Sequence, residues 1–276
     1  MKSITEDLLK STLIKRAEDS YKGSYGKVLV VGGNENMGGA AILTASAAVY
    51  SGAGLVTVAT AKANHTSLHA RLPEAMVVDS ADLESITKQV ESVDVIVIGP
   101  GLGLSQEALS ILTTVFSSVS PEQYLIIDGS AITLMVKHDL PYPKAQAIYT
   151  PHLGEWEKLS GLSPTNQEDE ANAIQQKKIG GTIVLKSNRT TIYSNDSIWK
   201  NTTGNPAMAT GGMGDTLAGM IAGFVAQFED KEKAVLAAVF LHSKIGDTLA
   251  EKQYVTLPSQ IIEHIPYVMK QYSQNR

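Results

Sequence analysis

Residues 94–103 read Asp-Val-Ile-Val-Ile-Gly-Pro-Gly-Leu-Gly, a continuous apolar run followed by a glycine-rich turn. A strand that lies between two layers of helices is buried on both faces, so its residues are apolar without alternation. Residues 28–31, Val-Leu-Val-Val, and residues 125–127, Leu-Ile-Ile, have the same character, and Gly or Asp-Gly follows them. These runs predict parallel strands that helices cover on both sides, and therefore an α/β fold.

The remaining elements follow from the alternation of apolar, β-rich runs with helical stretches. Residues 3–19 predict an amphipathic helix and residues 231–252 a long alanine-rich helix, with a last helix after Pro258. Residues 190–201 predict an antiparallel hairpin at the sheet edge that turns at Asn195-Asp196. One domain, residues 1–276, is expected, a three-layer α/β/α fold around a mostly parallel sheet. The expected strands are 27–31, 55–59, 75–78, 94–98, 124–127, 147–150 and 182–185.

The composition limits the possible functions. Hydrophobic residues make up 43% of the 276 positions and charged residues 18%, which is typical of a globular protein with a large core. The chain has no cysteine, which excludes a disulfide framework, a zinc–thiolate site and a thiol nucleophile, and predicts a cytoplasmic protein. The formal net charge is −5, and no basic run is long enough to predict nucleic-acid binding.

One stretch is long enough to span a bilayer, because no charged residue occurs between Glu35 and Lys62. It is rich in Ala, Gly, Ser and Thr, and Gly52 and Gly54 divide it. This composition predicts a buried helix followed by a strand, with no membrane association. The first ten residues mix charged and apolar side chains and do not resemble a signal peptide.

Ligands of open α/β sheets bind beyond the carboxyl ends of the strands, so the residues that follow each expected strand are the candidate site. His65 and His69 have the spacing of a metal-binding pair on a helix, but no third ligand accompanies them, and we expect surface histidines. The segments that follow the strands carry glycines, two carboxylates and a basic pair; they are 32–34, 99–103, 128–130, 150–155 and 186–189.

A glycine-dense loop precedes a predicted helix at residues 204–224. Backbone amides of Gly211, Gly212, Met213 and Gly214 can point at one anion, and the helix dipole favours the same charge. Asp215 then lies where it can accept a proton from a hydroxyl that attacks a bound phosphate. The simpler interpretation is a tight turn with a carboxylate favoured at a helix N-terminus. The number of glycines favours the anion site, although the loop lacks Walker A spacing.

Residues 210–215, Thr-Gly-Gly-Met-Gly-Asp, resemble the Gly-x-Gly-Asp anion hole of ribokinase-like kinases. Together with residues 201–206, Asn-Thr-Thr-Gly-Asn-Pro, they resemble the ADP/ATP-dependent NAD(P)H-hydrate dehydratases of that superfamily. The sequence departs from the family pattern at Ala207 and Met213, outside the chemistry. The resemblance extends over about residues 25–250, through further segments at 32–34, 39–41, 51–56, 73–74, 99–103 and 150–155.

The resemblance implies a ribokinase-like fold and a stand-alone dehydratase, without the epimerase domain that bifunctional members carry. ADP or ATP, with Mg²⁺, would phosphorylate the hydroxyl of the hydrated nicotinamide ring in NADHX or NADPHX, and loss of phosphate would restore NADH or NADPH. With ADP the other products are AMP and phosphate. The family also implies a functional link to an NAD(P)H-hydrate epimerase, and superfamily analogy implies a homo-oligomer, such as a tetramer.

The resemblance also assigns residues. Ala40, Gly103 and His152 would contact the hydrated dinucleotide, and Asp215 would lie at its hydroxyl as the base. Glu155 would help to hold Mg²⁺, although His152 stands where the superfamily's Asn-x-x-Glu element has Asn. The anion hole would be Gly211, Gly212, Met213 and Gly214, and the nucleotide would contact Lys186, Ser187, Asn188, Arg189, Thr190 and Gly214.

Structural interpretations compete with these roles. Ala40 and Gly103 suit an ordinary helix and turn, and His152 suits a helix start where it bonds to the backbone. Asp128 could share the Mg²⁺ ion, yet an Asp before Gly is common in turns. Two other functions remain open: a ribokinase-like kinase for a small alcohol, such as hydroxyethylthiazole, hydroxymethylpyrimidine or a sugar alcohol, and a nucleotide sensor without activity.

Overall fold

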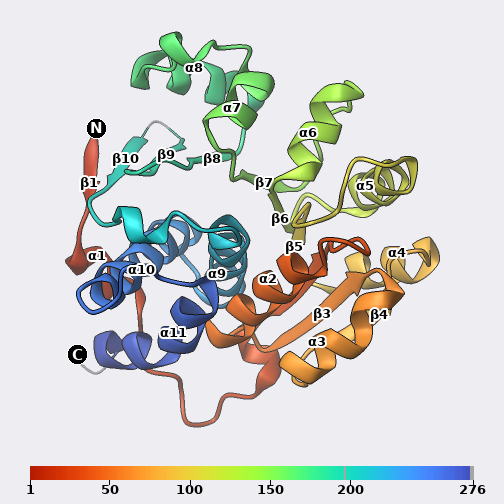
Figure 1. Ribbon diagram of the computed structural model, residues 1–276, viewed down its shortest axis with the longest axis horizontal. Helices are drawn as coiled ribbons and strands as arrows, with labels where there is room; N and C mark the ends of the chain where they lie inside the picture. Colours follow the sequence, from red (N-terminus) through yellow and green to blue (C-terminus); the bar gives the residue numbers. More distant parts are fainter. Residues whose placement is uncertain (196, 274–276) are drawn as a thin grey trace.

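The computed structural model describes residues 1–195 and 197–273, and in this part of the chain ten strands form one sheet between helices (Figure 1). The strand order is β1-β10-β9-β8-β7-β6-β5-β2-β3-β4, and neighbours from β8 to β4 are parallel. The strands are β1 Lys2–Ile4, β2 Lys27–Val31, β3 Leu55–Thr60, β4 Met76–Asp79, β5 Val95–Ile98, β6 Tyr124–Ile127, β7 Gln146–Tyr149, β8 Thr182–Leu185, β9 Thr191–Ser194 and β10 Ser197–Asn201.

Helices cover both faces of the sheet, which confirms the three-layer α/β/α prediction (Figure 1). One face carries α2, α9, α10 and α11, and the other carries α4 to α8. The helices are α1 Glu6–Thr12, α2 Gly38–Tyr50, α3 His65–Arg71, α4 Leu83–Ser92, α5 Gln106–Ser118, α6 Ser130–Lys137, α7 Leu153–Ser160, α8 Asp169–Ile179, α9 Met213–Gln227, α10 Lys231–Ala250 and α11 Pro258–Ser273.

The continuous apolar runs divide between two cores. Val28 and Val30 of β2 pack with α2 and α9, whereas Leu29 and Val31 pack in the opposite core. Successive side chains of a strand point to opposite faces, so a strand buried on both faces needs every residue to be apolar. In-register pairing of β2 with β5, such as Val31 with Ile98, brings their carboxyl ends to one edge.

The prediction of one helix over residues 3–19 is wrong. Residues 2–4 form β1, which pairs in parallel with β10, and α1 ends at Thr12. Ile4 is fully buried in the core, so sheet pairing and tertiary packing override the helical periodicity of this segment.

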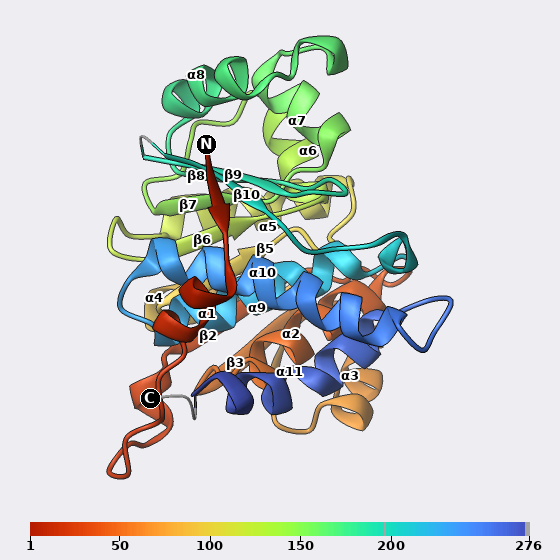
Figure 2. The same cartoon turned by 90° about the vertical axis from the view of Figure 1, so that its left-hand side faces the viewer.

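The predicted hairpin of β9 and β10 is confirmed as antiparallel, with Trp199 opposite Ile192. Its predicted position at the sheet edge is wrong, because β1 lies outside β10 (Figure 2). Asn195 has a φ of 47°, which suits a tight turn, whereas Asp196 lies outside the described residues.

The uncharged stretch between Glu35 and Lys62 forms α2 and β3, as predicted. Glycines let α2 approach α9 closely: a Cβ atom on Gly219 would lie 2.1 Å from the carbonyl oxygen of Thr44. At the far end of the same contact, Gln227 Nε2 donates to the carbonyl oxygen of Ser51 at 2.6 Å. These bonds and contacts fix α9 against α2 along its length.

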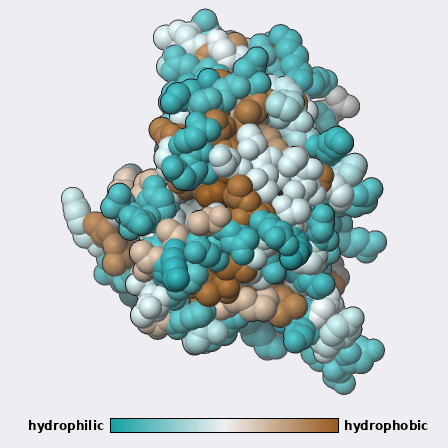
Figure 3. Space-filling view, turned by 90° about the vertical axis from the view of Figure 1, so that its right-hand side faces the viewer, coloured by the Kyte–Doolittle hydropathy of each residue, from teal (hydrophilic) through white to brown (hydrophobic). Residues whose placement is uncertain are grey.

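Within the described residues no helix is long and apolar enough to cross a membrane. Figure 3 shows one face of the molecule, on which hydrophilic side chains cover most of the surface and hydrophobic ones gather in a central band.

Candidate active site

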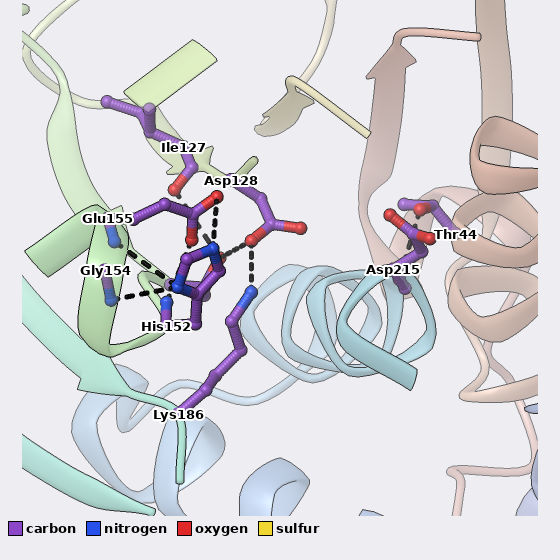
Figure 4. A network of polar contacts seen from close by, with 9 residues as sticks. Thr44, Ile127, Asp128, His152, Gly154, Glu155, Lys186 and Asp215 are labelled. Atoms are coloured by element: carbon purple, nitrogen blue, oxygen red, sulfur yellow. Dashed lines mark hydrogen bonds and ion pairs between the residues drawn. The ribbon is translucent and has the colours of Figure 1, made fainter. Parts of the chain in front are cut away.

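The segments that follow β2, β5, β6, β7 and β8 meet at one edge of the sheet, as predicted. Adjacent segments bond to one another: Gly33 N donates to the carbonyl oxygen of Pro100 at 2.8 Å, and Gly103 N donates to Ser130 Oγ at 3.1 Å. Asp215, in the first turn of α9, lies across from Asp128 and Lys186 (Figure 4). The structure therefore brings together the two groups of residues that the sequence singled out separately.

Helix α9 begins at Met213, directly after the glycine loop. Gly212 precedes it in the left-handed region with a φ of 92°, which a residue with a Cβ atom rarely adopts. The first N–H groups of a helix have no carbonyl partner inside it, so those of Met213, Gly214 and Asp215 are available to a ligand. A Cβ atom on Gly211 would meet nothing within 4 Å. The geometry fits the predicted anion hole, whose role stays a prediction.

A buried ion pair lies beside this helix start. Lys186 Nζ donates to Asp128 Oδ1 at 2.6 Å, and Thr150 Oγ1 donates to the same oxygen at 2.7 Å. Only 3% of Asp128 is exposed. A Cβ atom on Gly214 would lie 3.1 Å from Lys186 Nζ, so glycine at this position leaves room for the ammonium group. Lys186 therefore holds a fixed positive charge against the first turn of α9.

Asp128, Glu155 and Asp215 lie around the ammonium group of Lys186, and these charges shift the pKa of Lys186 and of Asp215 (Figure 4). Burial acts to lower the pKa of Lys186, but Asp128, Glu155 and Asp215 outweigh it and raise that pKa. Burial raises the pKa of Asp215 to about 6, with Asp128 and Glu155 adding to the rise and Lys186 opposing it. Asp215 is thus a carboxylate suited to exchange a proton near neutral pH.

His152 and Glu155 form a reciprocal cap at the start of α7. His152 Nδ1 accepts hydrogen bonds from Gly154 N at 3.0 Å and Glu155 N at 3.3 Å, and Glu155 Oε2 accepts from His152 N at 2.9 Å. This confirms the structural interpretation of His152. Because Nδ1 accepts, the neutral ring carries its hydrogen on Nε2, and the side chain is 63% exposed at the edge of the site. The outer nitrogen, Nε2, lies 3.6 Å from Glu155 Oε1, so the ring and this carboxylate are close together at the edge of the site.

Ala40 and Gly103 lie on touching segments. A Cβ atom on Gly101 would be 3.0 Å from that of Ala40, and one on Gly103, whose φ is 85°, would be 2.5 Å from Asn34 Nδ2. Close packing thus explains glycine at positions 101 and 103. Contact of Ala40 and Gly103 with a dinucleotide stays a prediction.

Known proteins are similar to this chain over most of its length. The sequence profile of the NAD(P)H-hydrate dehydratase family matches residues 28–267. The chain belongs to this family. It is 51% identical over 274 residues to the ADP-dependent (S)-NAD(P)H-hydrate dehydratase of Lactiplantibacillus plantarum, covering 99% of both chains.

Solved structures agree with this membership in the dehydratase family. A ribokinase-like superfamily protein of Enterococcus faecalis superimposes with a TM-score of 0.96 at 48% identity, over 99% of this chain and 97% of that one. The ADP/ATP-dependent NAD(P)H-hydrate dehydratase of Bacillus subtilis, co-crystallised with ATP and Mg²⁺, gives 0.86 at 30% identity over 98% of both. The ribokinase-like fold and the recognition of the dehydratase family are therefore confirmed.

The segment that the dehydratase resemblance assigns to the nucleotide connects β8 to β9. Ser187 Oγ accepts from Arg189 N at 3.1 Å, and Arg189 Nη1 donates to the carbonyl oxygen of Gly204 at 2.6 Å. Asp247 on α10 accepts from Gly204 N at 3.0 Å and from Asn205 Nδ2 at 2.6 Å. Arg189 and Asp247 thus fix the loop of residues 201–206 beside the nucleotide segment, which also contains Asn188 and the buried Thr190.

Sequence reasoning missed Asp247 and treated Asp128 only as a second metal contact. Asp128, Thr150 and Lys186 each come directly after one of three neighbouring strands, β6, β7 and β8. Their positions could have predicted the contact, since the first residues after adjacent parallel strands are neighbours. Asp247 lies in the last turn of α10, and no pattern in the sequence marks it.

Among the described residues no group of three or more His, Cys, Asp and Glu side chains could hold a metal ion. His65 Nε2 lies 3.3 Å from the carbonyl oxygen of Thr60, within its own segment. Glu155 and Asp128 nevertheless place carboxylate oxygens at the site. This fits Mg²⁺, which takes one or two carboxylates and fills its remaining positions with water and phosphate.

Paired alanine substitutions separate the two roles of the glycine loop. We expect Gly212→Ala to lower the free energy of unfolding by about 1–2 kcal/mol, because its φ is left-handed and its Cβ atom would lie 2.5 Å from Leu43 Cδ1. Gly211→Ala should leave stability unchanged and raise the KM for nucleotide, because its methyl group would enter the space beside the helix start. Urea unfolding and steady-state kinetics measure both, and an unchanged KM in Gly211→Ala would show that no phosphate binds there.

His152→Asn and His152→Ala distinguish capping from substrate contact. Asn is among the best N-cap residues, so His152→Asn should keep stability near that of the unmodified protein, whereas His152→Ala should lose about 1 kcal/mol. Both variants lack the outer ring nitrogen, and we expect both to raise the KM for the hydrated dinucleotide. Thermal unfolding and initial rates test this, and an unchanged KM in His152→Asn would leave His152 with the cap alone.

Proposed function

We propose that this protein is an ADP-dependent (S)-NAD(P)H-hydrate dehydratase that converts NADHX and NADPHX back to NADH and NADPH, releasing AMP and phosphate. The observation that carries this proposal is the position of Asp215. Asp215 lies at the start of α9, and Thr44 of α2, the helix that carries Ala40, donates to its backbone carbonyl oxygen at 3.1 Å. The charges of Lys186 and Glu155 act on its carboxylate. We infer that the hydrated dinucleotide (Ala40, Gly103, His152) binds on one side of Asp215 and ADP (residues 186–190 and Gly214) on the other. The two substrates would meet at its carboxylate.

Asp215 would act as the base for the phosphoryl transfer. It accepts the proton of the ring hydroxyl as that oxygen bonds to the terminal phosphorus of ADP, and the bond from that phosphorus to AMP breaks. The C–O bond of the resulting phosphate ester then breaks, and phosphate leaves with the bonding electron pair. Loss of a proton from the neighbouring carbon then restores the ring double bond, so that the hydrate has lost water and ADP has become AMP and phosphate.

The groups around Asp215 would stabilise charge on the transferred phosphoryl group. Lys186 places its ammonium group beside Gly214, and Met213 and Gly214 contribute the first N–H groups of α9, so that positive charge and hydrogen-bond donors lie at the same helix end. Mg²⁺ bound with the nucleotide would neutralise negative charge on the phosphates. Glu155 would hold it, with Asp128 as a neighbouring carboxylate.

The partners of this reaction stay predictions. An NAD(P)H-hydrate epimerase would supply the S epimer, and the protein would work in the cytoplasm as a homo-oligomer, such as a tetramer, without nucleic acid or membrane. Light scattering of the purified protein measures the oligomeric state, and a monomer would contradict that expectation.

Absorbance at 340 nm tests the proposed reaction. Hydrated NADH with Mg²⁺ and ADP should regain the dihydronicotinamide band, whereas the same mixture without nucleotide should not. A parallel sample with ATP gives the preferred phosphoryl donor. A flat band with every nucleotide would contradict the dehydratase activity. Formation of a stable phosphorylated alcohol from hydroxyethylthiazole or hydroxymethylpyrimidine would instead support a small-molecule kinase on the same fold.

A further inference from the structure

A cavity of about 600 Å³ lies at the opposite end of α2 and α9 from Asp215. Its walls are the segment of residues 13–16, the C-terminal ends of α2 and α9, and the last turns of α11. The segment that follows α1 runs beside α11 in both views (Figure 1, Figure 2). Helix α9 has 15 residues and is about 22 Å long, so this cavity is separate from the candidate active site.

The lining combines an apolar wall with basic residues. Leu13, Val49, Phe228 and Met269 supply apolar side chains. Of the described residues that line the cavity, three are basic (Lys15, Arg16 and Lys270) and none is Asp or Glu. The chain as a whole has more acidic than basic residues, with 28 against 23. The local excess of positive charge is therefore opposite to the net charge of the protein.

Helix C-termini carry partial negative charge that would oppose an anion, but side chains already cover it here. Gln227 Nε2 donates to the carbonyl oxygens of Ser51 at 2.6 Å and Gly223 at 2.8 Å. Arg16 donates to the carbonyl oxygen of Gly52, and its guanidinium group stacks 3.7 Å from the ring of Tyr25. The carbonyl oxygens of Ser51, Gly52 and Gly223 thus have hydrogen-bond partners.

Two lysines remain for a ligand. Lys15 lies 3.8 Å from Glu18, but both side chains are largely exposed (73% and 95%), so this pair is weak. Lys270 has no ion-pair partner among the residues that the structure describes, and it sits one residue beyond Met269 of the apolar wall. A ligand whose charged head group pairs with Lys270 could therefore pack an apolar body against that wall.

We propose that this cavity binds a small amphipathic anion, a molecule with an apolar body and one carboxylate, phosphate or sulfonate head group. The volume is within the range of pockets that hold ligands of this size, about 300–1,000 Å³. The apolar body packs on Leu13, Val49 and Met269, and the head group pairs with Lys270 and Lys15. The proposal concerns binding and does not depend on the dehydratase activity.

The fluorescent aryl sulfonate 8-anilinonaphthalene-1-sulfonate is a suitable probe, because it has this chemistry and brightens in apolar surroundings. We expect saturable binding of one probe per chain to the folded protein. Lys270→Glu and Ile14→Asp should each weaken probe binding at least tenfold, because both positions line the cavity. Both side chains are also exposed, so the fold should be retained. The matched controls Lys178→Glu and Leu83→Asp, at exposed positions outside the cavity, should bind the probe as tightly as the unmodified protein.

Competition identifies the required charge. Dodecanoate should displace the probe, and dodecyltrimethylammonium, with the same chain length and the opposite charge, should not. Equal displacement by the two amphiphiles, or unchanged probe affinity in both Lys270→Glu and Ile14→Asp, would overturn the proposal. Absence of saturable probe binding would also overturn the proposal. This outcome includes a protein in which a second copy of the chain covers the cavity and keeps the probe out.

Discussion

Asp215→Asn should lower the kcat for NADH formation from hydrated NADH by about 10²- to 10⁴-fold, the usual contribution of a general base. Asn keeps the shape of the side chain but cannot accept the proton of the ring hydroxyl. The backbone bond from Thr44 Oγ1 to the carbonyl oxygen of residue 215, at 3.1 Å, does not involve the replaced group, so the position of α9 should be retained. Absorbance at 340 nm gives the rate, and isothermal titration with ADP checks that nucleotide binding survives.

The pH dependence of the unmodified protein should report the same group. Burial, Asp128 and Glu155 raise the pKa of Asp215 to about 6, and a base works only when deprotonated. The rate should therefore fall as the pH drops below about 6, well above the ordinary range of an aspartate. A rate that stays constant down to pH 4.5, or near-normal turnover by Asp215→Asn, would rule Asp215 out as the base.

The variant Asp215→Asn should be more stable than the unmodified protein at pH 7. The folded state binds a proton on Asp215 more tightly than the unfolded chain does, so the free energy of unfolding decreases as the pH rises from about 4 to 6. Above that range the ionised carboxylate costs stability, by up to about 3 kcal/mol. Asn lacks this charge, and urea unfolding at pH 7 and pH 4 should show a gain at pH 7 that shrinks at pH 4.

Lys186→Met should damage both stability and activity. It leaves Asp128 as a buried carboxylate without its cation, and breaking a buried pair in this way costs about 3–5 kcal/mol. It also removes the positive charge at the start of α9, so the KM for nucleotide should rise and kcat should fall at least a hundredfold. Urea unfolding and steady-state kinetics at saturating hydrate measure the two effects.

A double variant separates these two effects. Asp128→Asn combined with Lys186→Met removes both charges and should recover most of the lost stability, because no unpaired ion stays buried. It should recover no activity, since the ammonium group is still missing. Recovered activity in the double variant would mean that Lys186 serves only to neutralise Asp128, and that it does not contact the phosphates.

The sequence predicted those parts of the molecule in which neighbouring residues determine the structure. Residues 94–103 and their counterparts indicate buried parallel strands locally, because a short apolar run that a glycine turn ends is typical of a strand covered on both faces. The glycine loop before α9 was also predicted from the sequence, because the glycines and the helical stretch that follows them are adjacent. In the structure Gly212 has a left-handed backbone and α9 begins at the next residue. The family resemblance then placed these local elements in one known site.

What the sequence did not reveal depends on partners far along the chain. The pairing of β1 with β10 joins residues almost 200 positions apart, and nothing near Ile4 indicates it. The bond between Lys186 and Asp128 spans 58 positions, and the pKa of Asp215 depends on three charges from three different segments. Distances of this kind follow only from the assembled sheet.

The position of β1 also sets the order in which the protein can fold. During synthesis, Lys2–Ile4 is made about 195 residues before Ser197–Asn201, the strand with which it pairs. The central parallel strands can assemble during synthesis, whereas β1 stays unpaired until β10 has been made. A bulky tag fused directly before Lys2 would therefore hinder the last step of folding, whereas one placed after α11 would leave that step unaffected.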